Sequence, residues 1–147
     1  MTFNAILNLN DTQMTTVKSK YIGELRTSSI HVKSGAEITT DAPTDNNGKG
    51  EAFSPTDLLA TALGSCAVTI MGLCALQNNF DIGTPSFNIG KTMAAAPRRV
   101  AKLNVVISFT KPSFTEKQKQ ILRHAAENCP VAKSLHPQLV QELIFNW

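Results

Sequence analysis

Charge is scarce in this sequence and does not cluster. Charged residues make up 17% of the 147 positions, and the basic ones behind the net charge of +3 are scattered apart from the pair Arg98-Arg99. A protein that binds nucleic acid usually carries a clustered basic face. We therefore expect no nucleic acid partner.

Long hydrophobic runs are also missing. No uninterrupted apolar stretch approaches the roughly 20 residues that cross a membrane. The first residues, MTFNAILNLNDTQ, have neither the basic start nor the small-residue cleavage site of a signal peptide. We therefore expect a cytoplasmic protein without a membrane partner.

Cysteine is rare, and the three that occur are Cys66, Cys74 and Cys129. Cytosolic disulfides are usually transient and catalytic or redox-sensing, so we expect no structural disulfide framework. No histidine lies at metal-ligand spacing from a cysteine, and we expect neither a metal ion nor a cofactor. A Cys-His hydrolase would need a histidine beside Cys66 in space, and no motif supports one.

The pattern that is present predicts an α+β fold, with helices on one face of a largely antiparallel sheet. The length fits a single domain over residues 1–147. A long helix begins after Ser54, where Pro55 occupies the first helical position and Asp57 supplies an acid, and should reach about Asn78. The other predicted elements are a β-meander over 16–40, a hairpin of strands 86–95 and 100–110, a helix capped by Ser113 or Thr115 that ends near 128, a short helix after 130 and a last strand over 141–147.

Cys66 lies in the middle of the apolar stripe predicted for the long helix. The stripe follows spacings of four, three, four and three, through Leu59, Leu63, Cys66, Ile70 and Leu73. Small residues around Cys66 let a backbone or a ligand approach closely, and the mid-helix Gly64 costs about 1 kcal/mol relative to alanine. A cysteine on such a stripe is more often a small core residue than a nucleophile, and composition leaves both interpretations open. The helix has little polar surface on its central turns, which suggests cover on more than one side, as in a dimer.

Cys129 precedes Pro130, which makes it the expected N-cap of a short helix, VAKSL. Free backbone N–H groups and the helix dipole at such a position favour a thiolate, the reactive form of cysteine. The plainer alternative is an ordinary N-cap without chemistry. Cys74 lies outside any motif, and we expect a buried core thiol.

Three segments together resemble the OsmC/Ohr family of bacterial thiol peroxidases. They are SGAEITTDAP (34–43), FSPTDLLATALGSC (53–66) and NCPVAKSL (128–135), and the resemblance runs from about Tyr21 to the C-terminus. One helical cysteine would be weak evidence, but two in these settings and this order, after the Asp-Ala-Pro loop, are a specific combination. The resemblance implies an intertwined homodimer, with the long helices of both subunits at its centre and the sheets outside.

The resemblance also implies a mechanism. Cys66 would attack the distal oxygen of an organic hydroperoxide, release an alcohol and become a sulfenic acid. Cys129 would condense with it to a Cys66-Cys129 disulfide, which an external dithiol, of the lipoyl type or similar, would reduce. The implied function is that of an enzyme, a thiol-dependent peroxidase in oxidative stress defence.

Arg26 falls where the family has an arginine that stabilises the thiolate and orients the peroxide, about nine residues before Gly35. The family's partner glutamate follows the helix-starting proline, a position that Thr56 occupies here. Thr56 can form hydrogen bonds but holds no charge, so we expect Asp57 or Glu51 to anchor Arg26 instead. The plainer interpretation of Arg26 is an exposed strand arginine without a function.

The departure at Thr56 keeps a second class of function open. A binding or redox-sensing protein on the same fold would hold a small hydrophobic molecule in an apolar cleft at the dimer interface, with vestigial or regulatory thiols. Thiol reactivity separates the two hypotheses, because a peroxidase should have one thiol that reacts with an organic hydroperoxide far faster than free cysteine does.

Overall fold

A computed structural model of the chain describes residues 15–110 and 113–147. By its internal contacts the chain divides into two compact units, Met1–Pro55 and Thr56–Trp147. Each unit contains one three-stranded sheet, and the helices longer than one turn belong to the second. The predicted α+β class is confirmed, whereas the single domain over residues 1–147 stays a prediction.

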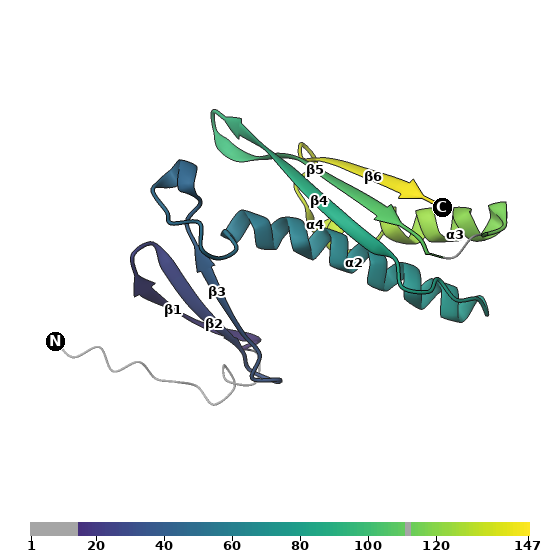
Figure 1. The fold of residues 1–147 in the computed structure, drawn as a ribbon, viewed down its shortest axis with the longest axis horizontal. Helices are drawn as coiled ribbons and strands as arrows, with labels where there is room; N and C mark the ends of the chain where they lie inside the picture. The colour runs from purple at the N-terminus through teal and green to yellow at the C-terminus, as the bar shows by residue number, and fades with distance from the viewer. Residues whose placement is uncertain (1–14, 111–112) are drawn as a thin grey trace. The chain divides into compact units, whose positions relative to one another are not determined.

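The first unit is an antiparallel three-stranded sheet (Figure 1). Strand β1 (Val17–Gly23) pairs with β2 (Arg26–His31), which pairs with β3 (Glu37–Asp41), as the predicted meander requires. A loop with a short 3-10 helix, η1 (Thr44–Asn46), follows. None of the large apolar side chains described in this unit is buried. Because such a small sheet has no core of its own, it needs cover from another surface.

The second unit packs helices against a mixed sheet. Its elements are α2 (Pro55–Gln77), β4 (Ser86–Ala95), β5 (Arg98–Ser108), α3 (Glu116–Glu127), α4 (Pro130–Ser134) and β6 (Val140–Asn146). Figure 1 shows β4 crossing α2, and β5 lies between β4 and β6 in the sheet. The β4–β5 pair is antiparallel as predicted, but β5 and β6 are parallel. The helices α3 and α4 supply the crossover that a parallel pair needs.

The apolar core of the described residues lies entirely in the second unit. The face of α2 that it buries consists of Ala60, Leu63, Gly64, Ala67, Met71 and Ala75. The predicted stripe is therefore wrong in part, since Leu73 is 48% exposed and Cys66 is half-buried. The opposite, exposed face consists of Ala62, Ser65, Thr69, Leu73 and Leu76. Because α2 is apolar nearly all round, periodicity could not separate these two faces.

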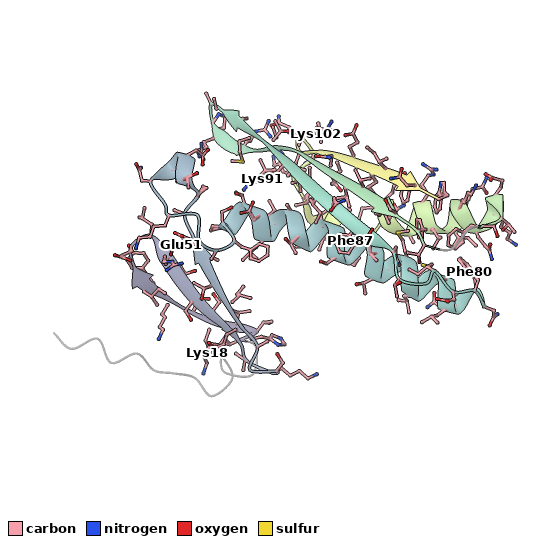
Figure 2. The ribbon with its side chains drawn as sticks, viewed as in Figure 1. Lys18, Glu51, Phe80, Phe87, Lys91 and Lys102 are labelled. Carbon is pink, nitrogen blue, oxygen red and sulfur yellow. The ribbon has the colours of Figure 1, made fainter. Side chains whose placement is uncertain are left out.

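Gly64 lets the sheet lie close to α2 two residues before Cys66. A Cβ atom at Gly64 would lie 2.6 Å from Cδ1 of Ile89 and 3.1 Å from Cδ2 of Phe87, both on β4 (Phe87 is labelled in Figure 2). This close packing offsets the helix-propensity cost of a mid-helix glycine.

By length and composition alone, α2 could also cross a membrane. The mean hydropathy of its most apolar 18-residue window is 1.9, and 33% of that window is buried. The core helix of a soluble protein passes the same test, so this is weak evidence. The absence of a membrane partner stays a prediction.

Helix α3 leads the chain to Cys129. Of the two predicted caps it uses Thr115, whose Oγ1 accepts from the backbone N–H of Gln118 at 3.2 Å. The Gln118 side chain accepts from the backbone N–H of Thr115 at 2.9 Å, which completes a capping box. The helix buries Leu122, Ala125 and Ala126, and it thereby fixes the position from which α4 starts.

Candidate functional site: a pair of thiols

Cys129 is the N-cap of α4, as the sequence predicts. Its backbone is extended, with φ −63° and ψ 153°, and Pro130 is the first helical residue. The Cys129 Sγ accepts a hydrogen bond from the backbone N–H of Ala132 at 3.5 Å. The residue is completely buried.

Burial raises the pKa of the Cys129 thiol, because a thiolate there would lose its hydration. The backbone N–H of Ala132 opposes this effect, and the neighbouring Cys66 thiol adds to it. The expectation that this helix start favours a thiolate is therefore wrong. The five-residue α4 supplies too little stabilisation to outweigh desolvation, and Cys129 keeps its proton at neutral pH.

Cys66 and Cys129 are neighbours. The Cys66 thiol lies within hydrogen-bonding reach of the Cys129 thiol, although 63 sequence positions separate them. Both are free thiols; Cys66 is half-buried on α2, whereas Cys129 has no exposed surface. Cys66 is therefore the more accessible residue of the pair.

Cys74 does not belong to this pair. It lies eight residues after Cys66 on α2 and is half-buried at the edge of the core, where a fully buried thiol was expected. Cys74 follows Leu73 of the exposed face of α2, which explains why it is not fully buried. Cys74 thus offers an internal comparison for the reactivity of the other two thiols.

Arg26 lies at the start of β2 in the first unit, where two acids hold it. Its Nη2 is 3.2 Å from Oε2 of Glu51, and its Nε is 3.8 Å from Oδ2 of Asp41. Of the two anchors expected from the sequence, Glu51 is confirmed, whereas Asp57, which lies in the second unit, stays a prediction. The side chain of Arg26 is only 25% exposed, so the exposure expected for a plain strand arginine is wrong, whereas the function of Arg26 stays a prediction.

Within the second unit, Asp57 pairs with Lys91 of β4. The Lys91 Nζ donates to Oδ1 of Asp57 at 2.5 Å and to Oγ1 of Thr56 at 2.8 Å (Lys91 is labelled in Figure 2). A lysine 34 positions further along the chain therefore neutralises the acid at the start of α2. Sequence alone could not show this, because the pair depends on how β4 crosses the helix.

Asp41 is the acid that the sequence analysis missed. Its side chain is completely buried, and its Oδ2 accepts from the backbone N–H of Glu51 at 2.9 Å. This hydrogen bond lowers the pKa of Asp41 against the opposing effect of burial, and the Arg26 guanidinium lowers it further. The Asp-Ala-Pro motif was the available signal, because its aspartate is Asp41.

The structure thus brings together Cys66 and Cys129, which lie in one unit. Arg26 lies in the other unit, so its role beside Cys66 stays a prediction. Within residues 15–110 and 113–147, no group of three or more histidine, cysteine, aspartate or glutamate side chains is placed to hold a metal ion.

Comparisons with known proteins test the family resemblance. A family model described as OsmC-like protein matches residues 48–143. A solved structure from Psychrobacter arcticus 273-4, described as a candidate osmotic stress induced and detoxification response protein, is 50% identical. The alignment covers 90% of this chain and 96% of that one, with a TM-score of 0.87. A search of curated proteins finds no match.

Two more distant structures share the fold. The organic hydroperoxide resistance protein OsmC of Legionella pneumophila is 16% identical over 91% of this chain and 98% of its own, with a TM-score of 0.73. OhrB of Bacillus subtilis, also an organic hydroperoxide resistance protein, is 15% identical over 90% and 98%, with a TM-score of 0.63. Since the family model spans both the helix of Cys66 and the helix start at Cys129, and the 50% identical structure covers nearly the whole fold, the chain belongs to the OsmC/Ohr family of OsmC-like proteins.

Proposed function

We propose that the chain is a thiol-dependent peroxidase that reduces organic hydroperoxides. The observation that carries this proposal is the contact between the half-buried Cys66 thiol and the completely buried Cys129 thiol. Their exposure assigns their roles, because a peroxide must reach the first sulfur whereas the second sulfur needs to reach only the first. The description of the Legionella relative as an organic hydroperoxide resistance protein supports the substrate class.

The chemistry needs three steps. The Cys66 thiolate attacks the distal oxygen of the hydroperoxide, the O–O bond breaks, and the leaving alkoxide takes a proton and departs as an alcohol. The Sγ of Cys129 loses its proton and attacks the resulting sulfenic acid at Cys66, which releases water and forms the Cys66-Cys129 disulfide. A dithiol outside the chain then reduces this disulfide, so that two electrons pass from the dithiol to the peroxide in each turnover.

The proposed site includes Arg26 as the group that orients the peroxide. Two acids fix its guanidinium, which limits the side-chain freedom that substrate binding would otherwise have to restrict. No cofactor takes part in this chemistry, because the two sulfurs and the external dithiol carry the electrons.

A homodimer is part of the proposal. The exposed face of α2 is largely apolar, and the large apolar side chains described in β1, β2 and β3 are unburied. Both surfaces need cover, which a second copy of the chain would supply. The free cysteines fit a reducing compartment, and we propose a cytoplasmic location.

One equivalent of tert-butyl hydroperoxide added to the reduced protein tests the proposal. We expect the rapid loss of two of the three thiols, far faster than free cysteine reacts. Peptide mapping by mass spectrometry should locate the disulfide between Cys66 and Cys129 and leave Cys74 free. If the protein reacts no faster than free cysteine, the proposal that it is a peroxidase is refuted. The alternative of a binding or redox-sensing protein then takes its place.

The raised pKa of Cys129 predicts that disulfide closure accelerates with pH. Only the thiolate attacks, and its fraction grows about tenfold per pH unit below the pKa. Between about pH 6 and about pH 8 the closure rate should therefore rise on the order of a hundredfold. Quenched-flow mass spectrometry on wild type would give the rate of disulfide closure. The rate of sulfenic acid formation at Cys66, measured in Cys129→Ser, would show how much of the pH dependence belongs to that earlier step. A closure rate that stays constant over this range would contradict the assignment of Cys129.

A further inference from the structure

A cleft of about 420 Å³ opens in the second unit at the C-terminal end of α4. Its floor is apolar and consists of Leu59 on α2, Val100 on β5, and Leu135 and Leu139 after α4. Val100 and Leu139 are core residues that are only 7% and 8% exposed, whereas Leu59 and Leu135 are half-buried, so the floor borders the packed interior. Small-molecule sites typically measure roughly 300–1,000 Å³ and are mostly apolar. The cleft is therefore suited to a short aliphatic chain.

Two basic side chains, Arg99 and His136, line the same cleft. The Arg99 Nη1 donates to the carbonyl oxygen of Val100 at 3.4 Å, which ties the guanidinium to the floor. A guanidinium has five N–H donors, and this bond uses one. The His136 Nδ1 accepts from the backbone N–H of Gln138 at 3.1 Å, so a neutral ring carries its proton on Nε2 and can donate it.

No acidic side chain lines this cleft in the part of the chain that the structure describes. The acid next to it in sequence, Asp57, follows the lining residue Thr56 and is paired with Lys91 at 2.5 Å. Arg99 thus faces the cleft without a carboxylate among the lining residues. An apolar floor beside cationic donors is complementary to a ligand with an aliphatic chain and an anionic head.

We propose that this cleft binds a small aliphatic carboxylate, with the chain on the leucine and valine floor and the carboxylate on Arg99 and His136. A planar guanidinium matches the two oxygens of a carboxylate, and such charge-assisted bonds are about twice as strong as neutral ones. Neither Cys66 nor Cys129 lines the cleft. Thr56, which occupies the position of the family's glutamate, does line it, so the ligand would lie beside the start of α2 but its binding would need neither thiol.

Calorimetric titration of the full chain with decanoate, 1-decanol and decyltrimethylammonium tests the proposal. We expect decanoate to bind at least about tenfold more tightly than the alcohol, because the alcohol lacks the charge that Arg99 recognises. The cationic amphiphile should bind most weakly. This comparison uses the wild-type protein alone, so it does not depend on how any variant folds. Titration of Cys66→Ser should give the same affinities, which separates this proposal from the proposed peroxidase.

A matched pair of variants locates the site. Arg99→Gln should weaken decanoate binding by about tenfold to a hundredfold and leave the affinity for decanol unchanged. Arg98→Gln removes the same charge one residue earlier, outside the cleft lining, and should change neither affinity appreciably. The proposal is overturned if decanoate fails to bind, if decanol binds equally well, or if both variants lose affinity alike. It is also overturned if raising the protein concentration displaces decanoate, since a second copy of the chain would then occupy the cleft.

Discussion

Replacing Cys66 with serine should lower the rate of hydroperoxide reduction by a factor on the order of 10³ or more. A serine hydroxyl stays protonated at neutral pH, so the variant has no thiolate to attack the O–O bond. The side chain is half-buried and the substitution nearly isosteric, so the variant should keep the fold. Peroxide consumption measured with a dithiol reductant, together with circular dichroism of both proteins, would check both statements.

Cys129→Ser should stop the reaction one step later. Cys66 would still attack the peroxide and form a sulfenic acid, but no second thiol would lie within reach of it. Mass spectrometry should then find one added oxygen at Cys66, which dimedone traps. Cys74→Ser, on the same helix as Cys66, is the matched control and should react like wild type. A fast reaction that survives in Cys66→Ser and disappears in Cys74→Ser would reverse the assignment.

The features that the sequence predicted correctly depend on local interactions. Pro55 starts α2, Thr115 and Gln118 form the capping box of α3, and Cys129 caps α4. In each case the signal lies within four residues of the effect, because a cap satisfies backbone N–H groups in its own first turn. The helix starts before Cys66 and at Cys129 were therefore predictable from the sequence.

The features that the sequence could not give depend on the tertiary fold. Helical periodicity cannot choose the core face of a helix that is apolar nearly all round, so Leu73 was placed on the wrong side. The helix start at Cys129 suggested a thiolate, but burial by distant segments reversed the sign of the pKa shift. The contact of Cys66 with Cys129 followed only from the family resemblance, since spacing along the chain does not determine it.

Arg26 shows the same limit in the first unit. The missing glutamate at Thr56 indicated a substitute anchor, and Glu51 was among the candidates. Asp41 was not among the candidates, because an aspartate at the end of a strand is typical of a turn. Its role depends on the loop that brings the backbone N–H of Glu51 to its carboxylate. The position of Arg26 thus depends on the loop that joins Asp41 to Glu51.

Replacing Gly48 with alanine should disrupt this loop and destabilise the protein by about 3 kcal/mol. A Cβ atom at Gly48 would lie 1.6 Å from the carbonyl oxygen of Ala42 and 2.1 Å from its carbonyl carbon. These are backbone atoms of the same loop, and no side-chain rotation can relieve the overlap. The hydrogen bond from the Gly48 N–H to the carbonyl oxygen of Pro43, 3.0 Å long, would have to break as the loop opens.

Gly35→Ala is the matched control for this effect. Gly35 has a φ of +73°, but a Cβ atom there would meet nothing within 4 Å, so its substitution should cost only about 1 kcal/mol of backbone strain. Denaturant unfolding of both variants would give the difference in free energy. If Gly48→Ala proves no less stable than Gly35→Ala, the loop is not as tightly closed as the structure has it.

Hydrogen exchange would show where the Gly48→Ala effect acts. The backbone N–H of Glu51 is protected by its bond to the buried Asp41 carboxylate, and it should exchange faster once the loop opens. Opening the loop moves Glu51 away from Arg26, whereas Asp41 stays opposite Arg26 in the β2–β3 pair. Gly48, which belongs to no catalytic motif, should therefore control the guanidinium through geometry alone, and the same variant should slow peroxide reduction while it leaves the contact of the two thiols in the second unit intact.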